Sequence, residues 1–210
     1  MELFLYAFAA LFSIMNPLGT VPIFVGLTQA EDAAERRRTA ILTTINVLVI
    51  LLISFFLGKY LLQFFGISLN SLRIAGGLII VSSGFALLTG SFAKHKGMKN
   101  KRVQKDLSQR ERFSITPLAI PMLAGPGSIS LLITFQQEYT LTVEILYILL
   151  AIATTCLATF LILRSSFLIV KALGASGINA ISRIIGFIVI AIGIEYISGS
   201  VLDLLKITGL

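Results

Sequence analysis

The sequence predicts an all-α membrane protein whose six transmembrane helices form two inverted three-helix repeats, with helices 1 and 4 broken by proline. The first observation is composition, because 56% of the 210 residues are hydrophobic, only 13% are charged, and the mean hydropathy is +0.95. A soluble domain carries about 25% charged residues. The second is a series of apolar runs long enough to cross a bilayer. The third is a likeness between the two halves of the chain.

Six apolar runs divide the chain. Each is close to the roughly 20 residues that a membrane helix needs, and none alternates as a β-barrel strand does. The first is expected to be a genuine span rather than a cleaved signal peptide, because no Lys or Arg precedes Arg36. The expected spans are residues 3–28, 39–67, 74–93, 113–134, 141–163 and 184–202.

The basic residues indicate an orientation. Thirteen of the seventeen Lys and Arg residues fall on one side of the expected membrane, eight of them in the loop 92–112. By the positive-inside rule this side is cytoplasmic, so both termini face outward. The loop, which marks topology or alternatively binds anionic lipid, separates a first repeat, 1–91, from a second, 113–210. Nucleic-acid binding is not expected despite the net charge of +7, because these charges lie between apolar runs.

The two halves share landmarks in the same order. Asn16-Pro17 and Pro22 in the first span are matched by Thr116-Pro117 and Pro121 in the fourth. Gly26 and Gly125 each follow the second proline by four residues, and Arg73 and Arg183 open the third and sixth expected spans. Since each half has three spans, an odd number, the second half enters the membrane with the opposite orientation.

The proline segments are the candidate binding site. Proline lacks an N–H and frees the carbonyl of the preceding turn, and such breaks at membrane depth are tolerated where protein or a water-filled cavity satisfies them. A half-helix that starts there presents free N–H groups to an anion, and nearby glycines allow close approach. The alternative is that these prolines are ordinary kinks. The candidate substrate-binding residues are Asn16, Pro17, Gly19, Thr20, Thr116, Pro117, Gly125, Gly127 and Ser128.

Ionisable and polar groups inside spans are candidates for coupling or gating. Glu195 falls near the middle of the sixth span and could carry a coupling proton, or could pair with a neighbouring helix or lie nearer the interface. Arg73 and Arg183 could act as gates, although interfacial anchoring is the commoner role of such residues. Asn46, and Thr154 or Thr155, could face the same cavity or bond to a neighbouring helix.

Two stretches resemble a known family. Residues 15–24, Met-Asn-Pro-Leu-Gly-Thr-Val-Pro-Ile-Phe, and 117–127, Pro-Leu-Ala-Ile-Pro-Met-Leu-Ala-Gly-Pro-Gly, are similar to the signature of the MarC family of six-span bacterial and archaeal membrane proteins. The resemblance covers essentially the whole chain. It implies a prokaryotic inner-membrane carrier of small neutral amino acids such as glycine or alanine, with the Asn16 and Thr116 segments at its centre.

Catalytic chemistry is not expected. The chain has one histidine, His95, in the basic loop, and one cysteine, Cys156, which together cannot build a metal site. No Walker or Rossmann glycine pattern is present, so neither an ATP-driven pump nor a nucleotide cofactor is expected. The sequence therefore predicts a non-enzymatic secondary transporter, coupled to H⁺ or Na⁺. An uncoupled channel and a non-transporting scaffold are the alternatives, and a homo-oligomer is left open.

Overall fold

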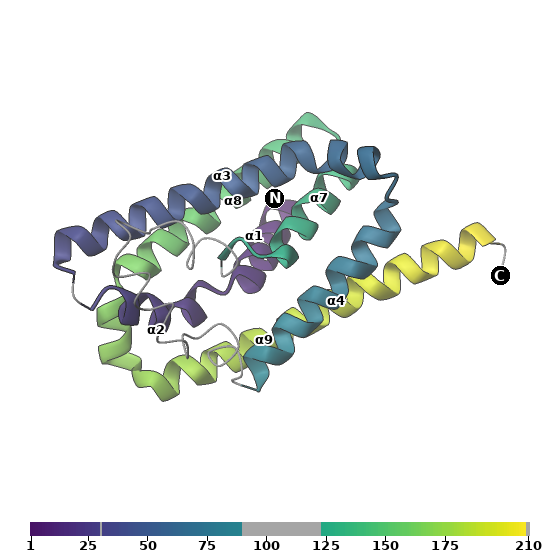
Figure 1. Ribbon diagram of the computed structural model, residues 1–210. Coiled ribbons are helices and arrows are strands. Elements are labelled where there is room, and N and C mark those ends of the chain that lie inside the picture. The colour runs from purple at the N-terminus through teal and green to yellow at the C-terminus, as the bar shows by residue number, and fades with distance from the viewer. Residues whose placement is uncertain (30, 90–122, 209–210) are drawn as a thin grey trace.

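The computed structural model describes residues 1–29, 31–89 and 123–208, and within these ranges every regular element is a helix (Figure 1). The all-α class that the sequence predicts is confirmed for this part of the chain. The elements are α1 (Glu2–Met15), α2 (Pro17–Leu27), α3 (Ala33–Phe65), α4 (Leu69–Leu88), α7 (Pro126–Glu138), α8 (Thr142–Arg164) and α9 (Ser166–Thr208).

Five stretches in the described ranges are long and apolar enough to cross a membrane. They are Glu2–Leu27, which comprises α1 and α2, together with Ala33–Phe65, Leu69–Leu88, Thr142–Arg164 and Ser176–Leu205. Residues 113–122 of the fourth expected span, 113–134, lie outside the described residues, and the rest of the span leads into α7 and includes the first turns of that helix. The number six therefore remains a prediction.

Three helices, α3, α4 and α9, begin at least five residues before the expected spans that they contain, and α4 begins at Leu69 and not at residue 74. α3 begins at Ala33, because the Asp32 side chain accepts hydrogen bonds from the first-turn N–H groups while Glu35 bonds back to the Asp32 N–H, a capping box. α9 begins at Ser166 and is interrupted at Gly174, where φ is 63°. Arg183 therefore does not begin this helix, and the point at which the sixth span enters the membrane stays a prediction. The stretch from Ser176 to Arg183 contains several polar residues, which a helix accommodates but which interrupt an apolar run.

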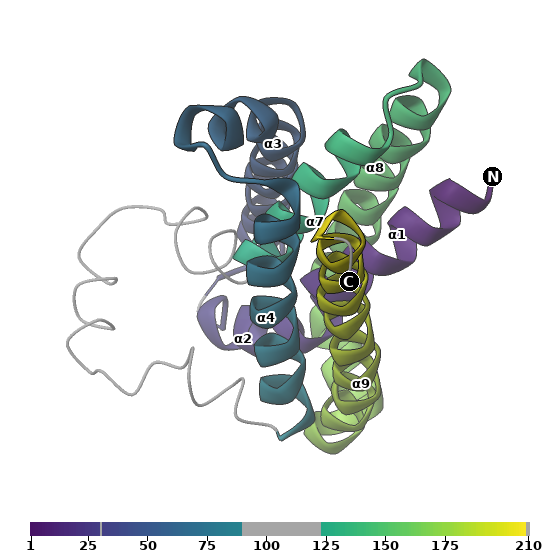
Figure 2. The same ribbon diagram turned by 90° about the vertical axis from the view of Figure 1, so that its right-hand side faces the viewer.

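α4 and α9 run side by side through two reciprocal glycine contacts (Figure 2). A Cβ atom added to Gly77 would lie 2.7 Å from the carbonyl oxygen of Gly193, and one added to Gly193 would lie 2.8 Å from that of Gly77. Gly84 and Gly186 make the same exchange, at 2.7 and 2.8 Å. Because the higher-numbered residue of α4 meets the lower-numbered residue of α9, the helices are antiparallel with their backbones almost in contact.

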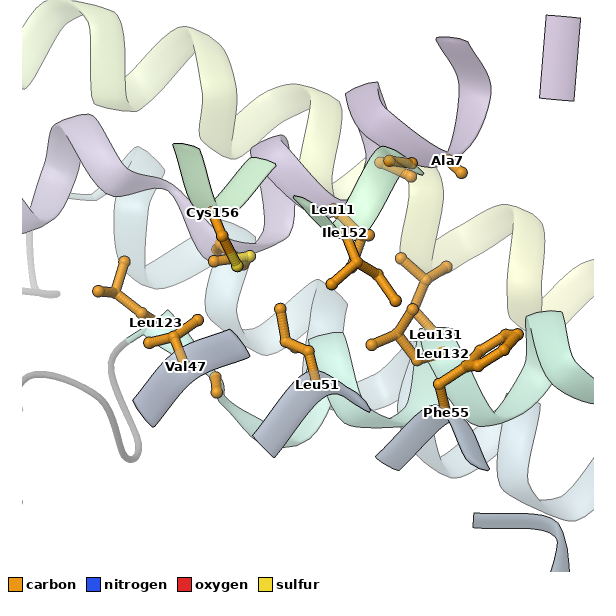
Figure 3. Close-up of a cluster of buried hydrophobic side chains, with 14 of the residues drawn as sticks. Ala7, Leu11, Val47, Leu51, Phe55, Leu123, Leu131, Leu132, Ile152 and Cys156 are labelled. Atoms are coloured by element: carbon orange, nitrogen blue, oxygen red, sulfur yellow. The ribbon is translucent and has the colours of Figure 1, made fainter. Parts of the chain in front are cut away.

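The main core lies where α1, α3, α7 and α8 meet (Figure 3). Val47, Leu51 and Phe55 recur every four residues on one face of α3 and point toward Leu131 of α7 and Ile152 of α8. The opposite face of α3 is also apolar, with exposed Ile45, Val49, Ile53 and Phe56. A helix that is apolar all round belongs in a lipid environment.

Candidate functional site

Asn16 breaks the first membrane-crossing stretch in two. Its backbone is left-handed, with φ of 42° and ψ of 64°, and it is the one non-glycine residue of the described ranges with a positive φ. Its N–H still closes α1 by bonding to the Phe12 carbonyl at 2.9 Å. Pro17 then begins α2, where the missing N–H of proline costs nothing because first-turn N–H groups have no intrahelical acceptor. The break that the sequence predicts at Asn16-Pro17 is confirmed.

The Asn16 side chain is buried and only partly satisfied. Its Oδ1 accepts a hydrogen bond from the Gly19 N–H at 3.2 Å, which caps α2. Its Nδ2 has no hydrogen-bond partner in the described part of the chain, although the residue is only 1% exposed. A buried donor without an acceptor is costly, so the Asn16 amide is a candidate donor to a ligand. Thr20, also fully buried, donates to the Asn16 carbonyl at 3.3 Å.

A second helix that begins with proline, α7, starts at Pro126. Gly125 is its N-cap residue, in extended conformation, and α7 has no side-chain cap. The Ser128 hydroxyl is fully buried and does not cap the helix. It donates to the Gly125 carbonyl at 2.9 Å. Within the described ranges no side chain caps α7, so its first-turn N–H groups are available to another acceptor.

The starts of α2 and α7 lie close together. A Cβ atom added to Gly127 would lie 3.0 Å from Ile80 of α4 and 3.2 Å from Ile14, two residues before the Asn16 break. Ile14 and Leu18 in turn pack against the cluster that contains Ile80. The structure therefore brings together, around Ile14 and Ile80, the positive ends of two proline-started helices. The predicted residues Asn16, Pro17, Gly125 and Gly127 belong to these two helix starts.

Thr116 and Pro117 lie outside the described residues. In the described part of the second half, the helix that begins with proline starts at Pro126. Pro126 is not among the predicted site residues, although Gly125-Pro126-Gly127-Ser128 carries the signal of an N-cap residue followed by proline at the first helical position.

The candidate coupling and gating residues do not converge on this site. Glu195 and Arg183 are both exposed on α9, and Asn46 is half-buried on α3. Arg73 is buried except for 15% of its side chain, and it forms an ion pair with Glu138 at the end of α7. Its Nη1 also lies 3.9 Å from Oδ2 of Asp203, so Arg73 ties α4 to α7 and α9.

Thr154 and Thr155 of α8, the two threonines that the sequence offered as cavity-facing, differ in their hydrogen bonds. Thr154 is satisfied within its own helix, because its hydroxyl donates to the carbonyl of Leu150 at 2.8 Å. Thr155 is fully buried, and its hydroxyl has no hydrogen-bond partner within the described ranges. Thr134 of α7 is also buried, and its hydroxyl also has no hydrogen-bond partner within the described ranges. Thr134 is not among the predicted site residues.

Comparison with known proteins supplies the family. The sequence model described as "MarC family integral membrane protein" matches residues 1–205. The chain belongs to the MarC family. Among MarC-family relatives, the Escherichia coli membrane protein YhcE is 37% identical over 190 residues, which cover 90% of this chain and 87% of YhcE. The inner membrane protein MarC of Citrobacter koseri is 35% identical over 204 residues, covering 93% and 92% of the two chains. No solved structure matches.

Proposed function

We propose that this MarC-family protein is a secondary transporter that carries small neutral amino acids, such as glycine and alanine, across the cell membrane. The observation that carries the proposal is the approach of the α7 start, at Gly127, to Ile14, which lies two residues before the Asn16 break, together with a buried Asn16 amide whose Nδ2 lacks an acceptor in the described part of the chain. The substrate class follows from the family resemblance, and the geometry supports it.

The helix starts suit a carboxylate. Each helix N-terminus carries a partial positive charge and unsatisfied N–H groups, and α7 has no side-chain cap that competes for them. The Asn16 Nδ2 adds a neutral donor. The side chains at the two starts are small, with Gly19, Thr20, Gly127 and Ser128. A small substrate with one carboxylate fits this set of groups.

We propose alternating access between two inverted repeats. The residue pairing that relates the two repeats differs from the one expected from the sequence. The same interval along the chain separates Pro17 from Pro126, Gly77 from Gly186, and Gly84 from Gly193. Under this register the glycine contact of Gly77 with Gly193 becomes that of Gly186 with Gly84. The packing partners correspond in the same way. α2 packs on α8 and α9, and its counterpart α7 packs on α3 and α4, which are the counterparts of α8 and α9. This exchange supports a pseudo-two-fold axis that passes between α4 and α9.

The proposal includes a membrane topology and a coupling ion. The chain crosses the membrane six times, both termini face outward, and the loop 92–112 faces the cytoplasm. Transport is coupled to H⁺ or Na⁺, and the exposed position of Glu195 on α9 leaves the choice of ion to experiment.

Uptake by proteoliposomes tests this function. The purified protein is reconstituted, and labelled glycine and alanine uptake is measured with an imposed H⁺ gradient, with an imposed Na⁺ gradient and with neither. A coupled carrier accumulates substrate above equilibrium under one gradient. Flux that only equilibrates indicates a channel or facilitator, and no flux by folded protein contradicts transport of these substrates and favours a scaffold.

A further inference from the structure

A second polar site lies at one end of the helix bundle, away from the Asn16 break. It is a pocket of about 290 Å³ between the end of α2, the start of α3, the end of α8 and the start of α9. Its wall is formed by Phe24, Ala33, Arg36, Arg37, Leu163, Arg164, Ser166 and Phe167. Three of these eight residues are arginines and none is acidic.

The arginines are not neutralised by their neighbours. None of Arg36, Arg37 and Arg164 forms an ion pair with an acidic group in the described part of the chain. Three acidic residues nearby on the chain are hydrogen-bonded elsewhere, and one of them, Glu35, accepts from the Asp32 N–H. Asp32 caps the first turn of α3, with its Oδ1 2.8 Å from the N–H groups of residues 34 and 35, and Glu31 accepts from the Thr39 hydroxyl at 3.0 Å.

One arginine is held in place by an aromatic ring. The guanidinium carbon of Arg36 lies 4.1 Å from the ring centroid of Phe167, which is the second residue of α9. A guanidinium that stacks on a ring uses its face and leaves the N–H donors at its edge free for an oxyanion. The pocket thus contains a preorganised donor fork.

Ser166 supplies a second and independent sign of a ligand. It is completely buried, it lines the pocket, and its hydroxyl has no hydrogen-bond partner among the described residues. Buried hydroxyl groups are nearly always satisfied, so this one is a candidate donor to a ligand in the pocket that Ser166 lines. A ligand with acceptor oxygens would satisfy Ser166 and the three arginines together.

The pocket is amphipathic. Phe24 and Leu163 are buried at its wall, with Phe167 half-buried beside Arg36. It lies where two membrane-crossing helices, α3 and α8, have their basic ends, which is the level at which lipid headgroups meet water. Cationic pockets between membrane helices on the basic side are suited to anionic headgroups, with acyl chains along the apolar wall.

We propose that this pocket binds the phosphate of an anionic membrane phospholipid. The arginines and Ser166 hold the phosphate oxygens, and Phe24, Leu163 and Phe167 contact the upper acyl chains. The proposal is independent of the transported substrate, because it uses none of the residues at the starts of α2 and α7. A bound lipid would join the α2–α3 turn to the α8–α9 turn, one from each half of the chain.

Lipid binding to the full-length protein tests the proposal. Native mass spectrometry measures the binding of dioleoyl phosphatidylglycerol and, in parallel, dioleoyl phosphatidylcholine, which has the same acyl chains and phosphodiester but no net charge. We expect phosphatidylglycerol to bind about tenfold more tightly. The double variant Arg36→Gln/Arg164→Gln should lose that preference, since a charge-assisted hydrogen bond accounts for about a tenfold change.

Matched variants separate a built site from general attraction. Arg38→Gln removes the same charge two residues from Arg36, at an exposed position that does not line the pocket, and should change affinity by less than about twofold. Ser166→Ala should weaken binding about threefold without changing the charge, and it tests the site even if the double variant does not fold.

Three results would overturn the proposal. Equal binding of the two lipids would show that charge is not recognised. Equal losses in Arg38→Gln and in the double variant would show a diffuse basic surface instead of this pocket. Binding of inorganic phosphate that depends on Arg36 and Arg164, with no binding of phosphatidylglycerol, would show that a free anion, and not a lipid, is the ligand.

Discussion

The Asn16 side chain lies directly over Gly19 at the start of α2. Its Oδ1 accepts the Gly19 N–H at 3.2 Å, and a Cβ atom on Gly19 would overlap its Nδ2. Gly19 is therefore the residue that leaves room for the Asn16 amide in its buried position. This relationship links a single glycine to the donor on which the proposed substrate site depends.

The first prediction concerns Gly19. Gly19→Ala should displace the Asn16 side chain and reduce glycine uptake by about tenfold, because the lost donor interaction is of the size of a charge-assisted hydrogen bond. Gly26→Ala, in the same helix but with nothing within 4 Å of an added Cβ atom, is the control and should retain uptake. Similar uptake in the two variants would remove Asn16 from the site.

The second prediction concerns the contact between α4 and α9. Gly84→Ala places a methyl group 2.7 Å from the Gly186 carbonyl, and backbone atoms cannot yield as a side chain can. Overpacking of this kind costs about 1–3 kcal/mol. We expect a lower thermal unfolding temperature in detergent. Gly199→Ala on α9, with open space around it, should be neutral or slightly stabilising, and an equal loss in both variants would contradict the glycine contact.

The third prediction concerns Arg73 and Glu138. Their ion pair joins α4 to the end of α7, and Arg73 is largely shielded while Glu138 is 36% exposed. A double-mutant cycle with Arg73→Gln and Glu138→Gln should give a coupling energy of up to about 1 kcal/mol in thermal unfolding. The matched cycle with Arg183→Gln, an exposed arginine of α9, should give none. Coupling of the same size in both cycles would refute the pairing.

The fourth prediction concerns topology. Six crossings place both termini on the outer side of the membrane, whereas five would place them on opposite sides. Protease-accessible tags at each terminus, and one within residues 92–112, distinguish these cases in intact spheroplasts. We expect both terminal tags to be cleaved and the loop tag to be protected. Cleavage of only one terminal tag would exclude the six-span arrangement.

Much of the fold could be predicted from hydropathy, because lipid selects apolar runs of bilayer length. Hydropathy alone does not give the helix ends, since they depend on local hydrogen bonds. α3 starts at Ala33 through the Asp32 capping box, and α9 extends back to Ser166 across a bend at Gly174. Neither signal is apolar, so a search for apolar runs passes over both.

The candidate site was partly predictable for a similar reason. Asn16-Pro17 combines an N-cap residue with a proline at the first helical position, and the structure places a helix break there. The sequence pairing of Pro17 with Pro117 favoured a repeated Pro-Leu motif, whereas the described structure has its second proline-started helix at Pro126. The contact of Gly77 with Gly193 could not be predicted, because it depends on the crossing point of two helices.

The most direct test of the transport account is counterflow, which needs no knowledge of the coupling ion. Liposomes loaded with unlabelled glycine are placed in labelled glycine, and the transient accumulation of label is compared for the wild type and Asn16→Gly. Glycine tolerates the positive φ at this position, so the variant removes the amide while it keeps the break. The account predicts counterflow in the wild type and about a tenfold loss in Asn16→Gly. Equal counterflow in both proteins would contradict it.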